Sequence, residues 1–175
     1  MITLVCGTQN SGKSDKAEAL LTAAEAGHKY YIATMKVFDE AGVERVTKHR
    51  RKREGKGFIT MEIPYRVDRA LDDIPEPENS ALLIECISNL AGNEMYDDAE
   101  RALHSGATDS EIEALADEVL EDIKLLALRS REVIAVANIF PEDDDNYDAG
   151  TKIYVRLNNL LTDKIRQMAD RVVDV

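Results

Sequence analysis

The stretch GTQNSGKS at residues 7–14 limits the possible folds of this chain more than any other part of the sequence. Its pattern, Gly7-x-x-x-x-Gly12-Lys13-Ser14, is that of a phosphate-binding loop, which requires a strand before it and a helix after it. An apolar run over 2–6 precedes the stretch, and a segment rich in Ala, Leu and Glu over 13–26 follows. A polar turn that matches by chance is the alternative. Because both flanking elements are predicted, we expect a strand, a phosphate loop and a helix in this order.

Each conserved position of such a loop has its own physical task. Gly7 and Gly12 allow backbone angles that other residues resist, so that successive N–H groups can point at phosphate oxygens. The helix that follows presents its positive N-terminal end to the same anion. Lys13 adds a charge near the β- and γ-phosphates, and the Ser14 hydroxyl can bind magnesium.

The rest of the chain alternates between apolar runs and helical patterns. We expect strands over 30–34, 58–63, 81–86, 132–137 and 171–175, and helices over 39–53, 67–74 and 150–169. A further helix begins at the capping box formed by Thr108 and Glu111, while 87–105 is predicted to be helical in pieces. The strands are continuous Val/Ile/Leu runs, which is typical of a parallel sheet with helices on both faces. The sequence thus predicts an α/β, P-loop NTPase-like fold, with residues 1–175 in a single nucleotide-binding domain.

Charge and cysteine content exclude several other classes of protein. The net charge of −12, from 34 acidic and 22 basic residues, argues against a dedicated nucleic-acid binder, whose binding face is basic. Cys6 and Cys86 lie in or at the end of apolar runs, so we interpret both as buried small hydrophobes and expect neither a disulfide nor a zinc site. No apolar stretch approaches 18 residues, and no signal-type segment begins the chain, so a reducing, cytoplasmic setting is expected.

A carboxylate at the end of a neighbouring strand is the expected partner of a phosphate loop. Glu85 ends the run ALLIE and is the candidate, since it could hold Mg²⁺ directly or through water. The alternative is a strand-end carboxylate that faces solvent.

The only dense positive cluster is KHRRKR at residues 48–53. It is either a solvated helix face or a second clamp for phosphates. The cations around His49 disfavour its imidazolium form and so lower its pKa from an ordinary value of about 6.5. A neutral imidazole can act as a nucleophile toward phosphorus. We assign no role to His28 or His104.

Four blocks of sequence resemble a known family. They are GTQNSGKS (7–14), YIATM followed by FDE and ERVTKHR (31–50), LLIECISNLAGNEM (82–95), and VAN followed by YDAGTKIYVRL (136–157). Together they are similar to the bifunctional adenosylcobinamide kinase / adenosylcobinamide-phosphate guanylyltransferase family of cobalamin biosynthesis. The frame of Arg45, His49 and Arg50 is more specific to that family than the phosphate loop. Ile139 after Asn138 departs from the family pattern, which commonly has Glu there.

The resemblance implies two reactions at one nucleotide site. The enzyme would phosphorylate adenosylcobinamide with GTP or ATP, and then transfer GMP from GTP through a guanylylated His49 to the phosphorylated product. The family is commonly trimeric. The resemblance implies that the following residues contact nucleotide, with Ser14 and Glu85 also serving Mg²⁺: Gly7, Thr8, Gln9, Asn10, Ser11, Gly12, Lys13, Ser14, Ala33, Thr34, Met35, Arg50, Arg51, Lys52, Arg53, Glu62 and Glu85.

Two other functions remain open at this point. One is a monofunctional small-molecule kinase that uses the phosphate loop alone, with a structural His49. The other is a GTP-binding module without turnover, against which the intact Lys13, Ser14 and His49 argue.

Overall fold

A computed structural model describes residues 1–37, 40–98, 100–104, 106–142 and 146–175. Within the helix α2 (Glu40–Arg53), it leaves out the side chains at positions 40, 41, 45, 48, 49 and 52.

The centre of the described structure is a parallel sheet of six strands in the order β3-β2-β4-β5-β1-β6. The strands are β1 (Ile2–Gly7), β2 (His28–Ala33), β3 (Ile59–Glu62), β4 (Ser80–Glu85), β5 (Glu132–Asn138) and β6 (Arg171–Asp174). All six were predicted from the sequence within two residues at either end. Because every strand runs the same way, their carboxyl ends meet at one edge, and the 7–14 loop leaves β1 at that edge.

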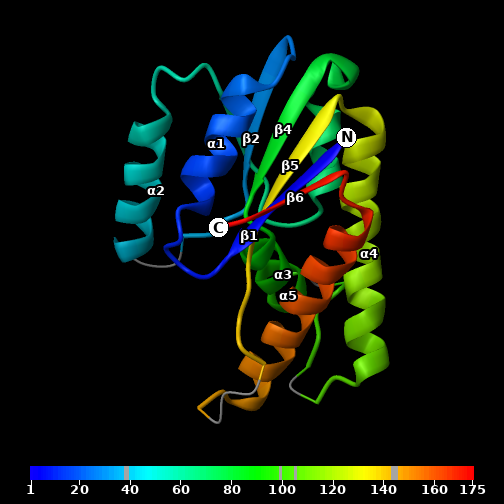
Figure 1. Cartoon of the computed structure of the whole chain (residues 1–175). Helices are drawn as coiled ribbons and strands as arrows, with labels where there is room; N and C mark the ends of the chain where they lie inside the picture. Colours follow the sequence, from blue (N-terminus) through cyan, green and yellow to red (C-terminus); the bar gives the residue numbers. More distant parts are fainter. Residues whose placement is uncertain (38–39, 99, 105, 143–145) are drawn as a thin grey trace.

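Helices cover both faces of the sheet, as the sequence predicted (Figure 1). The helix α1 (Lys13–Ala23) packs on one face, where α2 lies beside it at the left of Figure 1. The helices α3 (Ile87–Tyr96), α4 (Asp109–Arg129) and α5 (Ala149–Met168) cover the other face. Two 3₁₀ segments, η1 (Val67–Asp72) and η2 (Pro77–Asn79), connect β3 to β4.

Burial on both faces explains why the inner strands β1, β2, β4 and β5 are largely apolar without alternation, whereas the edge strands β3 and β6 are mostly exposed. In β1, Leu4 packs against the α3–α5 side and Val5 against the α1 side, and both are fully buried. Cys6 and Cys86 are buried and free, as predicted. In the described part of the chain, no helix is long and apolar enough to span a membrane.

The helix termini follow local capping chemistry. The predicted capping box opens α4, with Thr108 Oγ1 accepting from the Glu111 N–H at 3.3 Å. Asp148 caps α5 by accepting from the Thr151 N–H at 2.7 Å. The predicted helix over 67–74 was wrong in type, since it is a short 3₁₀ segment that begins after Arg66 in a left-handed conformation (φ 53°). The α1 helix ends three residues earlier than predicted, because Ala24 is extended.

Candidate active site

The 7–14 loop turns sharply from β1 into α1. Gly12 has φ 93° and Asn10 has φ 62°, so the loop uses left-handed backbone where the pattern predicted glycine at position 12. Gly7 is required for another reason, since a Cβ there would collide with the main-chain oxygen of Val175. This arrangement opens the first turn of α1 toward the carboxyl edge of the sheet.

Lys13 is folded back over the loop. Its ammonium donates hydrogen bonds to the carbonyl oxygen of Thr8 and, at 3.4 Å, to Ser11 Oγ. The side chain is 6% exposed, and burial lowers the pKa of Lys13. The loop therefore holds a nearly buried charge in a defined position above its own backbone.

Glu85 lies across the edge from this loop, at the end of β4. Its Oε1 accepts a hydrogen bond from Ser14 Oγ at 2.8 Å, and its buried Oε2 has no hydrogen-bond partner among the described residues. Burial raises the pKa of Glu85 to about 7, although the Ser14 hydroxyl and the Lys13 charge act in the opposite direction. The alternative of a carboxylate facing solvent is therefore wrong.

The loop and Glu85 enclose a pocket of 340 Å³, here called the loop pocket. Its walls reach from α1 to the end of β5. The lining residues are Gln9, Asn10, Ser11, Gly12, Lys13, Ser14, Asp15, Glu85, Cys86, Val136 and Asn138.

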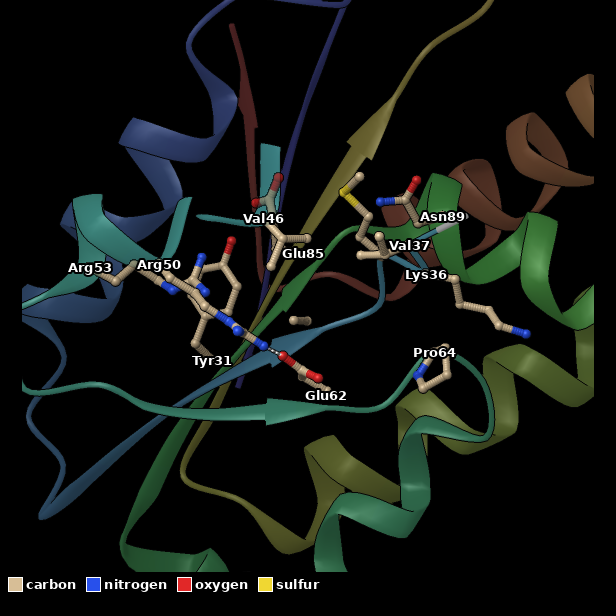
Figure 2. A pocket seen from close by; sticks show the side chains of 12 residues that line it. Tyr31, Lys36, Val37, Val46, Arg50, Arg53, Glu62, Pro64, Glu85 and Asn89 are labelled. Carbon is tan, nitrogen blue, oxygen red and sulfur yellow. Dashed lines mark hydrogen bonds and ion pairs between the residues drawn. The ribbon is translucent and has the colours of Figure 1, made fainter. Parts of the chain in front are cut away.

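A second pocket of 420 Å³, here called the α2 pocket, lies between α2 and the ends of β2 and β3. The guanidinium of Arg53 stacks on the ring of Tyr31 at 3.8 Å, and Arg50 forms an ion pair with Glu62. Figure 2 shows Arg50, Arg53 and Tyr31 on one side and Lys36 and Asn89 on the other. The residues that line the α2 pocket are Tyr31, Ala33, Met35, Lys36, Val37, Val46, Arg50, Arg53, Glu62, Pro64, Glu85 and Asn89.

The basic cluster is therefore not a uniformly solvated face. Arg53 is 7% exposed, and its Nε is buried without a hydrogen-bond partner among the described residues. A buried cation without full hydrogen bonding is costly unless an anionic group compensates it. Two cations of the cluster thus face a pocket that shares Glu85 with the loop pocket.

A third pocket of 600 Å³, the α3 pocket, adjoins the α2 pocket and shares Met35, Lys36 and Asn89 with it. Among its lining residues, only Met35 was predicted to contact nucleotide. The spacing of Asn89 and Asn93 could have indicated this site, because two amides four residues apart in a helix occupy one helical face. The remaining lining residues are Ser88, Gly92, Tyr96, Asp97, Thr151 and Tyr154.

Not every predicted contact residue lines a pocket. Thr34 is fully buried, where its hydroxyl donates to the Cys86 carbonyl at 2.8 Å and accepts from the Cys86 N–H at 2.7 Å. Arg51 is exposed and lines none of the three pockets described above. The side chains of His49 and Lys52 lie outside the described residues, although both positions belong to α2.

Comparisons with known proteins point to a family. The family model for cobinamide kinase / cobinamide phosphate guanyltransferase matches residues 3–175. No individual curated protein sequence matches the chain significantly. Among solved structures, the flagellar accessory protein FlaH from Methanocaldococcus jannaschii is similar at 13% identity and a TM-score of 0.47, over 99% of this chain and 70% of FlaH.

Proposed function

This chain belongs to the cobinamide kinase / cobinamide phosphate guanyltransferase family, and from that premise we propose that it catalyses both reactions by way of a guanylylated histidine. In the first reaction, the aminopropanol hydroxyl of adenosylcobinamide accepts the γ-phosphoryl group of GTP or ATP. In the second, GMP passes from GTP to His49 and then to adenosylcobinamide phosphate, which gives adenosylcobinamide-GDP.

One observation carries this proposal: the loop pocket and the α2 pocket meet at Glu85. The loop pocket offers backbone N–H groups and Lys13, and the α2 pocket offers the guanidinium groups of Arg50 and Arg53. A triphosphate lying across the two pockets would therefore have positive charge at both ends. Phosphoryl and nucleotidyl transfer depend mainly on such positioning and charge stabilisation.

The residues beside the loop fit a magnesium ion. Mg²⁺ prefers oxygen ligands and usually combines one or two protein groups with waters and phosphate oxygens. Ser14 Oγ and the unpartnered Oε2 of Glu85 supply such oxygens. No group of three or more His, Cys, Asp or Glu side chains that could enclose a metal occurs within the described residues, which agrees with a site completed by phosphates. When bound, the ion would neutralise charge on the β- and γ-phosphates, and the Lys13 ammonium would add a further positive charge near them.

In the guanylyl transfer, the bonds formed and broken balance without an external acid or base. A ring nitrogen of neutral His49 attacks the α-phosphorus of GTP, so that an N–P bond forms and pyrophosphate leaves. A phosphate oxygen of the acceptor then attacks the same phosphorus, and the electron pair of the N–P bond returns to the imidazole. Support for His49 comes from its place on α2, the helix that carries Arg50 and Arg53 into the α2 pocket.

The proposal is tested with GTP labelled at the α-phosphate. The wild-type protein should acquire label that is lost in acid and retained in alkali, as expected for a phosphoramidate. His49→Ala should lose this label and the transferase activity by several powers of ten, but keep measurable kinase activity. His104→Ala, which changes an exposed histidine that lines none of the three pockets described above, is the matched control and should label normally.

The outcomes separate the competing functions. Kinase activity without label in the wild-type protein would favour the monofunctional kinase. Neither activity in a protein that still binds GTP would favour the module without turnover. Normal label in His49→Ala would exclude this histidine as the nucleophile.

A further inference from the structure

Apart from Met35, no residue of the α3 pocket is among the nucleotide contacts considered above, and the pocket adjoins the α2 pocket. Taking the proposed function as its basis, we propose that the α3 pocket binds the phosphate-bearing arm of the corrinoid acceptor, and that the Lys36 ammonium holds the phosphate during guanylyl transfer. The position of the pocket suits this task, because it shares Met35, Lys36 and Asn89 with the α2 pocket. A group bound there lies next to the site proposed for GTP.

Hydrogen bonds fix the loop that carries Lys36 onto α3. Asn93 is 7% exposed, and its Nδ2 donates to the carbonyl oxygens of Thr34 and Pro64, each at 2.7 Å. The side chain of Asn93 thereby joins α3 to the segment after β2 and to the segment after β3. Lys36 stands two residues after Thr34, so the chain is held to α3 close to Lys36.

The opposite wall of the α3 pocket is fixed as well. The Tyr154 hydroxyl donates to the Ser88 carbonyl at 3.2 Å, and the Tyr154 ring packs against Phe140 with centroids 5.8 Å apart. The Ser88 hydroxyl accepts a hydrogen bond from the Asn138 N–H at 3.0 Å, which links this wall to the end of β5. The pocket is thus built from ordered contacts on both sides.

The Lys36 side chain lies where its ammonium can bind the phosphate of the acceptor. This side chain lines both pockets, and its ammonium lies 3.0 Å from an Asp97 oxygen and 5.5 Å from the centre of the Tyr65 ring. Figure 2 shows this side chain pointing away from the Arg50–Glu62 pair. Lys36 and Asp97 are each 30% exposed, and ion pairs of this kind contribute little net stability. A phosphate, which carries a charge of about −1.5 to −2, can therefore replace Asp97 as the partner of Lys36.

The chemistry of the other lining groups suits a cobinamide arm. They are mainly amides, hydroxyls and aromatic rings, among them Asn89, Tyr96 and Thr151, which can bond to the carboxamides at the edge of a corrin ring. Pockets of about 300–1,000 Å³ enclose drug-sized molecules. At 600 Å³, the α3 pocket suits the aminopropanol arm and an edge of the ring, while the rest of the larger macrocycle stays outside.

The first measurement is equilibrium binding of cobinamide and of cobinamide phosphate. In Lys36→Gln, the Kd for cobinamide phosphate should rise about tenfold or more, because a charge-assisted hydrogen bond is lost. The Kd for cobinamide, which lacks the phosphate, should stay within about twofold. Asp97→Asn removes a competing anion and should leave the Kd for cobinamide phosphate unchanged or lower.

The decisive result is a higher Kd for cobinamide phosphate in Lys36→Gln together with no increase in this Kd in Asp97→Asn. If Lys36 mattered only through its ion pair, Lys36→Gln and Asp97→Asn would weaken binding alike, and this would overturn the proposal. An unchanged Kd for cobinamide phosphate in Lys36→Gln would also overturn it. Lys164→Gln is the matched control, since Lys164 pairs with Asp117 at 2.7 Å between α5 and α4 and should leave both Kd values unchanged.

A second measurement distinguishes this proposal from the proposed function. In Lys36→Gln, the kcat/KM for passing label to cobinamide phosphate should fall about tenfold or more beyond any change in the rate at which the same variant acquires α-label from GTP without acceptor. Label in the wild type with unimpaired transfer in Lys36→Gln would overturn the Lys36 assignment alone. Absence of label in the wild type would overturn the guanylyl-histidine step and, with it, this role of Lys36.

Discussion

Replacing Arg101 with methionine should destabilise the protein strongly at pH 8 and much less at pH 5. The Arg101 guanidinium, 7% exposed, lies 3.2 Å from Glu94 Oε2 and 2.6 Å from Asp122 Oδ2. Glu94 is fully buried on α3, and its Oε1 also accepts from the Arg66 N–H at 2.6 Å. The substitution therefore leaves a buried carboxylate without its cation.

The expected loss follows from the two ways in which Glu94 can respond. It can stay ionised in an apolar site, which costs about 3–5 kcal/mol when one partner of a buried pair is removed. It can instead take up a proton, and for a carboxyl with an ordinary pKa of about 4.3 this costs about 5 kcal/mol at pH 8 but only about 1 kcal/mol at pH 5. We expect a loss of about 3–5 kcal/mol at pH 8, or roughly 6–20 °C in Tm for a chain of this size.

The sign of the pH effect is set by Glu94. Burial raises the pKa of Glu94, while the Arg66 N–H and the charge of Arg101 lower it, so removing Arg101 raises the pKa further. The folded variant then binds a proton more readily than the unfolded chain does. Its stability therefore rises relative to wild type as pH falls from 8 to 5, by about 2 kcal/mol or more.

Urea unfolding of both proteins at pH 8 and pH 5 measures this difference. Arg156→Met is the control, because Arg156 pairs with Asp109 on the surface and should contribute less than about 1 kcal/mol. Adding Glu94→Gln to Arg101→Met should recover stability at pH 8, since glutamine carries no charge. A loss below about 1 kcal/mol in Arg101→Met, or one of equal size at both pH values, would refute the reasoning.

Two further predictions concern the loop pocket. Lys13→Ala should lower both the kinase and the transferase activity by about a hundredfold or more, because each reaction needs a triphosphate held by the loop; kinase activity close to wild type would show that the loop is not the working site. Glu85→Gln should fold normally by circular dichroism but require more Mg²⁺ for half-maximal turnover, since a neutral amide binds the ion more weakly than a carboxylate; an unchanged Mg²⁺ dependence would remove Glu85 from the metal site.

Local sequence determined most of the architecture of this protein. Strands buried on both faces must be apolar throughout, and this continuous pattern identified the four inner strands β1, β2, β4 and β5 and the α/β class. The edge strands β3 and β6 are mostly exposed, and they were predicted from shorter segments that mix apolar and polar residues. The loop over 7–14 could also be predicted from the sequence, because its backbone needs glycine at position 12, where φ is 93°. The capping box at Thr108 is a contact within four residues, so its chemistry is complete in the sequence.

Other features depend on contacts between residues distant along the chain, which local patterns do not contain. The hydrogen bond from Ser14 to Glu85 joins positions 71 residues apart, and it required β4 and the loop to meet at one sheet edge. The sequence suggested Glu85 by its place at a strand end, but only the fold decided that its Oε2 is buried and its Oε1 is bonded to Ser14.

The α3 pocket is the clearest example of a feature that local sequence did not determine and the tertiary structure did. Lys36, Asn93 and Tyr154 lie in three separate parts of the sequence, and no local pattern shows that their side chains meet. They come together because β2, α3 and α5 converge at the carboxyl edge of the sheet, where Asn93 bonds to two main-chain segments. Packing and long-range hydrogen bonds, rather than local propensity, therefore decided where this second group of polar side chains lies.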